Sequence, residues 1–319
     1  MVPEYRHLPG HHCGSTALRN LLAFAGSEVS EELVFGLGAG ADFFYIALDG
    51  QSPSRLIAGR TSRLEEQFLE LTDLTAEMQT FAGPEQSWDA ARASVDAGMP
   101  ALLLTDLFHL DHYGNSAHFP GHAVVLAGYD DEHAHLSDTG FSDLQRTRLE
   151  NLARARHGNH PIFPLDGQML TLAGVGARID VEAAVRRAIA RNTGQMLEPP
   201  LGDYEGIPAL RRFAAEVEAW PEQLEDWRWC ARFAYQTIER RGTGGGMFRL
   251  MYSRFLAELG RDDDSRLAAQ ASGDWTELAG ALLRASEAED RQPSLWRDAG
   301  ERAVAVLESE QRLWSALAS

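Results

Sequence analysis

The pattern of apolar and polar positions differs between the two halves of the chain. The first half mixes helical spacing with short apolar runs typical of strands. Helices are predicted here at 15–25, 30–35, 63–71 and 87–97, and strands at 42–47, 101–104 and 123–129. The second half keeps helical spacing, with helices predicted at 181–191, 207–219, 223–240, 247–259, 275–286 and 295–317. The pattern therefore predicts an α+β first domain and an all-helical second domain.

The histidines indicate where the first domain ends. All 11 of them lie between His7 and His160. The stretch 157–167 is rich in Gly and Pro, which is typical of a connection between domains. We therefore expect one domain at residues 1–160 and another at 161–319. Chemistry that needs a group titrating near neutral pH is expected in the first domain.

The charged residues exclude several kinds of chemistry. All 29 cationic side chains are Arg, so a Schiff-base Lys, a Walker A Lys and a Ser–Lys pair are absent. The net charge is −18, and residues 1–165, with 10 Arg and 22 Asp or Glu, contribute −12 of it. Such acidity disfavours nucleic acid and anionic membranes as partners and favours cationic ligands.

Cysteine usage and hydropathy indicate a cytoplasmic protein. Cys13 and Cys230 lie far apart and make no disulfide framework. No run of about 18 apolar residues indicates a membrane span, and the N-terminus lacks the apolar core of a signal peptide. Cys230 lies among aromatic residues of a predicted helix, so we expect it in the core. The long terminal helix could mediate a homodimer, or it could equally cap its own domain.

Cys13 immediately precedes the first predicted helix. A helix N-terminus presents unpaired N–H groups and the positive end of the helix dipole, which favour a thiolate and lower the pKa of the Cys. His11 and His12 act in the same direction when protonated. The backbone N–H of Cys13 is also placed to bind an oxyanion. The alternative is a small, buried structural cysteine.

A thiolate nucleophile needs a base, and residues 122–138 offer one. An apolar strand from His122, an acidic turn and a second strand ending at Asp138 form a hairpin pattern. With the turn centred near Asp130, His122 and Asp138 would face each other on one side of the sheet. A carboxylate beside an imidazole fixes its tautomer and stabilises imidazolium. The sequence therefore predicts a triad of Cys13, His122 and Asp138; a structural His122 and a turn Asp138 are the alternative.

A dense group of possible metal ligands is the main rival to the triad. It comprises His109, Asp111, His112, His118 and His122. Three of these histidines could ligate zinc. However, the group lacks His pairs at helical i, i+4 spacing, and Gly and Pro interrupt it. A polar active-site loop without metal, with Tyr113 lining the pocket, is the simpler interpretation.

These motifs resemble the butirosin biosynthesis protein H family, whose first domain is a papain-like cysteine hydrolase fold. The resemblance lies in the Cys13-Gly14 pair at a helix start, the Gly121-His122 motif and the closing Asp138, and extends over 12–22, 30–40, 206–210 and 242–249. It implies a cysteine acyltransferase of antibiotic biosynthesis with a helical domain following the papain-like one. The family member transfers an aminoacyl group from an acyl carrier protein thioester, held on phosphopantetheine, to an amine of an aminoglycoside. No other cofactor is implied.

The resemblance also assigns roles by position. Cys13 would be the nucleophile, His122 the general acid/base and Asp138 the residue that orients it. Papain-like enzymes often carry an oxyanion donor about six residues before the Cys, which is His7 here. The other candidate donors and pocket residues are His12, Asn20, Gly38 and Tyr113. A cysteine amide hydrolase or peptidase with the same triad, and a catalytically idle binding protein of the same fold, are the alternatives.

Two further groups could contact the carrier protein. Gly244, Gly245 and Gly246 precede a predicted helix, and Arg249 follows; such a loop can bind a phosphate of the phosphopantetheine arm. A simple turn between helices is the alternative. A basic patch that an acidic carrier could contact is expected at Arg146, Arg148, Arg154 and Arg156, with a solvated helix face as the alternative. The expected partners are therefore an acyl carrier protein and a cationic amine.

Overall fold

The computed structural model describes residues 1–48, 50–114, 118–158, 163–172 and 179–319. These residues fall into two units. Unit 1 comprises Met1–Val34 and Ser62–Ala184, and unit 2 comprises Phe35–Thr61 and Val185–Ser319. The boundary expected between residues 160 and 161 lies outside the described residues.

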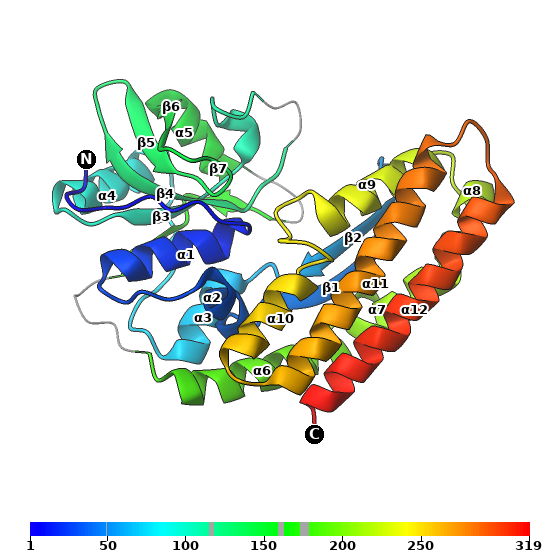
Figure 1. Ribbon diagram of the computed structural model, residues 1–319. Helices are drawn as coiled ribbons and strands as arrows, with labels where there is room; N and C mark the ends of the chain where they lie inside the picture. The colour runs from blue at the N-terminus through cyan, green and yellow to red at the C-terminus, as the bar shows by residue number, and fades with distance from the viewer. Residues whose placement is uncertain (49, 115–117, 159–162, 173–178) are drawn as a thin grey trace. The chain divides into compact units, whose positions relative to one another are not determined.

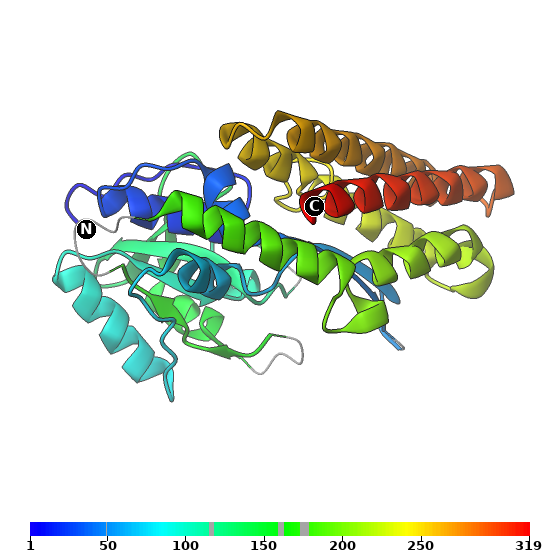
Figure 2. The ribbon, with the colours of Figure 1, turned by 90° about the horizontal axis from the view of Figure 1, so that it is seen from below.

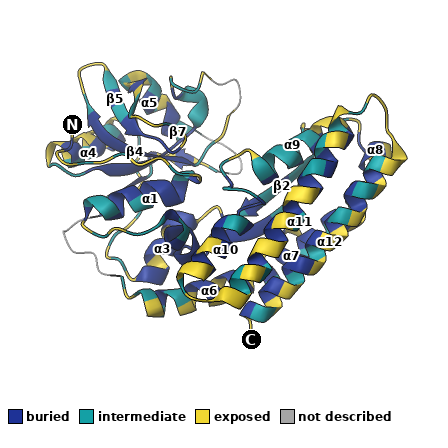
Figure 3. Cartoon of the chain, in the orientation of Figure 1, coloured by how far each residue is buried: buried dark blue, intermediate teal, exposed yellow. Residues whose placement is uncertain are grey.

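A five-stranded antiparallel sheet of order β6-β5-β4-β3-β9 forms the centre of unit 1 (Figure 1). Its strands are β3 (Ala101–Thr105), β4 (His122–Tyr129), β5 (His133–Ser137), β6 (Gln145–Arg148) and β9 (Met169–Leu170); β7 (His157–Gly158) and β8 (Leu165–Asp166) form a separate pair. Nearly every residue of β3 and β4 is buried (Figure 3). Strands covered on both faces are continuous apolar runs, which is why the sequence revealed these two and missed the polar β6.

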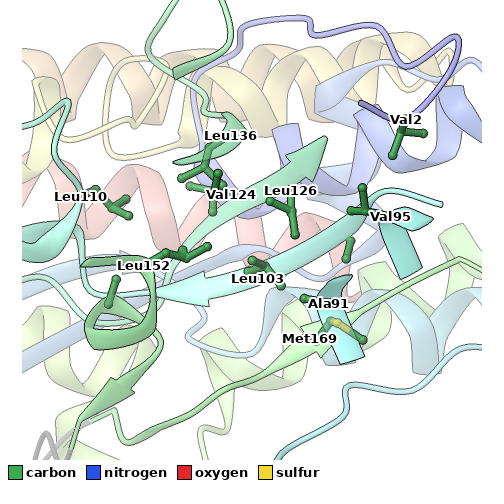
Figure 4. Packing of buried hydrophobic residues seen from close by; sticks show 13 residues of the cluster. Val2, Ala91, Val95, Leu103, Leu110, Val124, Leu126, Leu136, Leu152 and Met169 are labelled. Carbon is green, nitrogen blue, oxygen red and sulfur yellow. The ribbon is translucent and has the colours of Figure 1, made fainter. Parts of the chain in front are cut away.

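Unit 1 also contains helices. They are α1 (Cys13–Phe24), α3 (Leu64–Thr72), α4 (Pro84–Asp96), α5 (Leu149–Ala155), the start of α2 (Glu31–Leu37) and the short 3₁₀ helix η1 (Leu107–His109). Of these, α1, α4 and α5 contact this sheet and α3 contacts α1. α1 lies along β4 and β3. The side chains of Leu103, Val124 and Leu126 contribute to one core, which α4 covers with Ala91 and Val95 (Figure 4). Burying one such Leu or Val stabilises the fold by about 1.5–3 kcal/mol, which fixes the face each strand turns inward.

The β4–β5 hairpin has a different register from the expected one. Facing residues are Val125 and Ser137, and Leu126 and Leu136, with an irregularity before Gly128. A bulge adds one residue to β4 and, together with the longer turn, shifts the pairing by two positions. Because side chains alternate with a period of two, this shift leaves His122 and Asp138 on the same face as diagonal neighbours.

Unit 2 combines a β-hairpin with the helical half of the chain. The hairpin consists of β1 (Ala41–Ala47) and β2 (Arg55–Arg60). The helices are α6 (Val181–Leu197), which begins in unit 1, α7 (Gly206–Glu216), α8 (Trp220–Gln223), α9 (Trp227–Glu239), α10 (Arg249–Glu258), α11 (Asp262–Glu287) and α12 (Pro293–Leu317), with 3₁₀ turns η2 (Gly202–Tyr204) and η3 (Val217–Ala219). α11 and α12 lie side by side (Figures 1 and 2). The helical second half is confirmed.

The hairpin explains why unit 2 reaches back to residue 35. Phe43 of β1 packs against Phe213 and Trp275, with ring centroids 6.0 and 5.4 Å away. Tyr45 packs against Trp220 and donates its hydroxyl hydrogen bond to Glu216 at 2.6 Å. Phe43 and Tyr45, which lie in a stretch that the sequence places in the first domain, are therefore packed against the C-terminal helices. Among the described residues, no helix is long and apolar enough to cross a membrane.

Candidate active site

Cys13 is the first residue of α1, two positions earlier than the helix start predicted from the sequence. The shift follows from the cap: Ser15 N donates to Nδ1 of His12, 3.2 Å away. The preceding loop is held by buried Glu31, whose carboxylate accepts from the backbone N–H groups of His11 and His12 at 3.0 and 2.8 Å. The Cys13 side chain remains partly exposed. The fold thus fixes the backbone around a cysteine that solvent can reach.

Gly14 allows α1 and α3 to approach closely beside Cys13. A Cβ atom at this position would lie 2.2 Å from Oε1 of Glu65 and 3.1 Å from Cδ2 of Leu64. Any side chain larger than a hydrogen would therefore force the Glu65 and Leu64 side chains of α3 to move. The Cys-Gly pair thus has a packing reason in this chain.

His122 links Cys13 to Asp138. Nε2 of His122 lies 3.0 Å from Oδ1 of Asp138, and the imidazole also hydrogen-bonds to the Cys13 side chain. Asp138 holds Nε2, so Nδ1 is the nitrogen that remains for the sulfur. The His122 and Asp138 side chains are 7% and 0% exposed, which excludes water from competing for these bonds. The structure thus brings the three predicted triad residues together.

Two more side chains bind the same carboxylate. Nε2 of His112 lies 2.9 Å from Oδ2 of Asp138, and the Tyr113 hydroxyl donates to Oδ1 at 3.3 Å. Nδ1 of His112 lies 3.2 Å from the Thr147 hydroxyl. Tyr113 was expected in the pocket, whereas His112 was considered only as a zinc ligand. No local spacing reveals its contact, because it joins a loop to the end of a distant strand.

The charges of this cluster shift the pKa values in opposite directions. Burial would lower the pKa of His122, but the charge and hydrogen bond of Asp138, with the bond to Cys13, raise it to about 10. Burial would raise the pKa of Asp138, but His122 and His112 hold it well below its usual range. Burial and the charge of Asp138 raise the pKa of Tyr113. At neutral pH the cluster therefore favours an ionised Asp138, a protonated His122 and a neutral Tyr113.

The other oxyanion candidates have structural hydrogen bonds. The ring nitrogens of His7 lie 2.7 Å from Ser137 Oγ and 2.8 Å from the Phe141 carbonyl oxygen. Asn20 Nδ2 donates to the Leu8 carbonyl at 3.0 Å. His7 and Asn20 thus fasten the N-terminal segment, and His12 caps α1. The N-terminal turn of α1, with the backbone of Cys13 itself, is the better placed donor group.

The candidate phosphate site does not have the expected form. The Arg249 side chain is 0% exposed and donates to Glu310 at 2.7 Å and to the Gly59 carbonyl at 3.1 Å. A Cβ on Gly246 would lie 2.2 Å from Ser272 Oγ, so this end of the loop is packed against α11. Gly244 and Gly245 have φ angles of 66° and 104°, which suits a tight turn between helices. Arg249 is therefore committed to a buried ion pair and is not available to a phosphate.

The expectation of a single basic patch is wrong, whereas the pocket role expected of Gly38 stays a prediction. Gly38 is a buried residue of unit 2, whereas Cys13 belongs to unit 1. The four arginines do not form one patch, because Arg156 is 1% exposed and donates to the carbonyls of Ser87 and Gly167. Arg146 forms an ion pair with Asp130 at 3.1 Å.

The proposed zinc cluster is divided in the structure. His112 and His122 both contact Asp138, whereas Asp111 accepts from the backbone N–H of Arg148 at 2.7 Å. His109 and His118 gather instead with Asp106. The five residues that the sequence grouped therefore do not form one site.

Comparisons with known proteins give two family matches. Residues 12–139 match the family described as Butirosin biosynthesis protein H, N-terminal, and residues 150–317 match a domain of unknown function, DUF4872. Among solved structures, a C39-like peptidase from Bacillus anthracis is 20% identical, with 56% of this chain and 96% of that chain covered and a TM-score of 0.35. No curated protein matches the chain.

Proposed function

Because the chain belongs to the butirosin biosynthesis protein H family, we propose that it is a cysteine acyltransferase. It would take an acyl group from a carrier-protein thioester and pass it to an amine. The observation that supports this most is the continuous chain of contacts from partly exposed Cys13 through His122 to buried Asp138. A nucleophile, a proton carrier and an orienting carboxylate are the groups that acyl transfer requires.

The first step forms an acyl-enzyme. The Cys13 thiolate attacks the thioester carbonyl carbon, and the N-terminal turn of α1 stabilises the oxyanion. The carbon–sulfur bond to the carrier then breaks, and the leaving thiolate takes the proton of His122. The products are a carrier thiol, acyl-Cys13 and a neutral imidazole. Exchange of one thiolate for another is close to balanced in energy, so strong protonation of the leaving group is unnecessary.

The second step uses the neutral imidazole as a base. The acceptor amine attacks the acyl carbon, and its proton moves to His122 while the Cys13 thiolate leaves. The amide is released and the thiolate–imidazolium pair is restored. Buried Asp138 stabilises each imidazolium that forms. Water in place of the amine would give hydrolysis, which is the activity of the alternative amide hydrolase or peptidase.

The acidity of the chain supports a cationic acceptor. Residues 1–165 carry 22 Asp or Glu against 10 Arg. A negative potential raises the local concentration of polyamines such as aminoglycosides. Acceptor use is therefore expected to fall as the salt concentration rises, since screening weakens this attraction.

Intact-mass measurement after incubation with an acyl-pantetheine thioester tests the proposal. We expect the mass of one acyl group to be added to the wild-type chain and to Cys230→Ala, and no addition to Cys13→Ala. Cys230 is a matched control, because it is buried and burial raises its pKa. Loading the same acyl group on an acyl carrier protein should accelerate adduct formation if a carrier is the donor.

Adding an amine to the isolated acyl-enzyme distinguishes transfer from hydrolysis. Transfer predicts loss of the adduct with formation of an amide, at a rate that depends on amine concentration. Loss at a rate independent of the amine, with release of free acid, would support the hydrolase instead. No adduct from any thioester would support an idle binding protein.

A further inference from the structure

The loop between β3 and β4 holds a second group of possible ligands, separate from the triad. Asp106 follows β3, His109 ends η1, and His118 precedes β4. One ligand atom from each of the three residues lies within 4.8 Å of the others. Zinc ligand bonds are about 2.0–2.2 Å long, so ligand atoms around one ion are about 3–4 Å apart. Small rotations of the two imidazoles would bring the three ligand atoms from within 4.8 Å of one another to the spacing found around a bound ion.

The Asp106 carboxylate is already oriented as a ligand. The residue is 1% exposed, and its Oδ1 accepts from the backbone N–H groups of Phe108 and Phe119 at 3.1 and 2.9 Å. Its second oxygen, Oδ2, lies 2.5 Å from Nδ1 of His118. Hydrogen bonds of this kind orient the side chains that bind a metal ion directly and raise their affinity for it.

Phe108 orients both imidazoles. Its ring stacks on His118 with centroids 4.2 Å apart and meets His109 edge-on at 5.0 Å. The His118 side chain is 53% exposed, so an ion can reach the group from solvent. One buried carboxylate and two imidazoles, one half-buried and one exposed, thus lie close together beside the Phe108 ring.

We infer that Asp106, His109 and His118 bind one divalent transition-metal ion of the zinc type. Two imidazoles and one carboxylate match the ligand preference of Zn²⁺ and leave a fourth position for water. The ion would take the place of the proton that now lies between His118 and Asp106. Both histidines must present a lone pair, so binding weakens as they become protonated.

The location of this site gives it a positioning role. Its ligands come from both ends of the loop that carries His112 and Tyr113, and those two residues bind Asp138. An ion that joins Asp106 and His109 to His118 would restrain the backbone on the two sides of His112 and Tyr113 and so hold these two residues in place. The metal would therefore support the triad without touching the reacting atoms.

Calorimetric titration of the metal-free full-length chain with zinc chloride tests the inference. The titration uses the Cys13→Ala background, because thiolates also bind zinc. We expect one ion per chain, with affinity falling at least about 100-fold in His109→Ala and in His118→Ala. His135→Ala is the matched control, since His135 also contacts a carboxylate, Asp130, at 3.2 Å in unit 1. This control should bind zinc as the background does.

Cobalt(II) gives a second readout. Intense visible absorption bands are expected when cobalt enters a four-coordinate site of this ligand set, and they should be absent in His118→Ala. The inference would be overturned if millimolar metal gave neither a heat of binding nor visible absorption. It would also be overturned if both histidine variants bound the metal as strongly as the background does. Neither measurement includes an acyl donor, so a failure here leaves the acyltransferase proposal untouched.

Discussion

Each unit contains a fully buried carboxylate that binds three side chains, and the two differ in what those side chains are. Asp138 of unit 1 accepts from His122, His112 and Tyr113. Glu310 of unit 2 accepts from Arg249 at 2.7 Å and from the indole N–H groups of Trp275 and Trp314 at 2.6 Å each. Both carboxylate side chains are 0% exposed.

The partners of Asp138 can change protonation, whereas those of Glu310 cannot. An imidazole can give up and regain a proton during a reaction, but a guanidinium stays charged and an indole N–H only donates. The Asp138 network also ends at partly exposed Cys13, while Arg249, Trp275 and Trp314 are all 0% exposed. Buried charge alone therefore does not identify a site. A titratable network that reaches an accessible nucleophile does.

The largest expected effect is that of Asp138→Asn on acyl-enzyme formation. The amide carries no charge to stabilise imidazolium and favours the wrong tautomer of His122, so the rate should fall about 10⁴-fold. Stopped-flow measurement of thiol release would follow it. Glu310→Gln is the counterpart from the other network and should leave the rate per folded molecule unchanged. Equal losses in both variants would remove the distinction between the networks.

The next largest effect is on stability, and here the Glu310 variant, not the Asp138 variant, is expected to show the loss. Glu310→Gln leaves the buried Arg249 charge uncompensated and should lower the free energy of unfolding by about 3–5 kcal/mol. Urea denaturation monitored by tryptophan fluorescence would measure it, since Trp275 and Trp314 contact the altered group. The double variant Arg249→Met/Glu310→Gln removes the unpaired charge and keeps a side-chain carbonyl for the indole N–H groups, so it should recover part of the loss. A Glu310→Gln variant as stable as wild type would contradict a structural role for the pair.

The pH dependence of stability should be specific to the Asp138 network. Because the pKa of His122 is raised in the folded state, its protonation contributes fully to the free energy of unfolding below about pH 6.5. This contribution is lost as the pH rises through about 10. Lowered pKa of Asp138 stabilises the fold above about pH 3.8, with loss as pH falls. The melting temperatures of the wild type and of Asp138→Asn should therefore differ most between about pH 3.8 and pH 6.5, where both contributions are complete. A constant difference across the whole range would contradict the coupling.

The smallest effect expected is that of His112. His112→Ala removes one hydrogen bond to the Asp138 carboxylate, and acyl-enzyme formation should slow about 10-fold. His112→Gln keeps an N–H donor and should restore part of the rate. Because His112 acts through Asp138, the alkaline limb of the pH–rate profile should also move to higher pH in His112→Ala, since a carboxylate that has lost this donor stabilises the His122 imidazolium more strongly. A slower rate with an unmoved profile would indicate a purely structural role.

Local patterns predicted the elements that carry the site, and long-range contacts set the rest. The apolar run of β4, the acidic turn and the spacing to Asp138 were sufficient to place His122 beside that carboxylate. The predicted register was wrong, but the proximity of His122 and Asp138 was still predicted correctly, because a shift of two positions keeps both side chains on one face. His112 was missed as a partner of Asp138 because loop conformation sets that contact. Arg249 was misjudged because nothing near it in the sequence reveals Glu310, 61 positions away.

The most direct test of the titratable network is the pH dependence of Cys13 alkylation by iodoacetamide, followed by mass spectrometry. The account predicts rapid alkylation of Cys13 near neutral pH in wild type, with buried Cys230 unmodified. In Asp138→Asn and His122→Ala, alkylation of Cys13 should be slow near neutral pH and approach the wild-type rate only in alkaline solution, where the thiol ionises without an imidazolium beside it. The same pH profile in all three proteins would contradict the account.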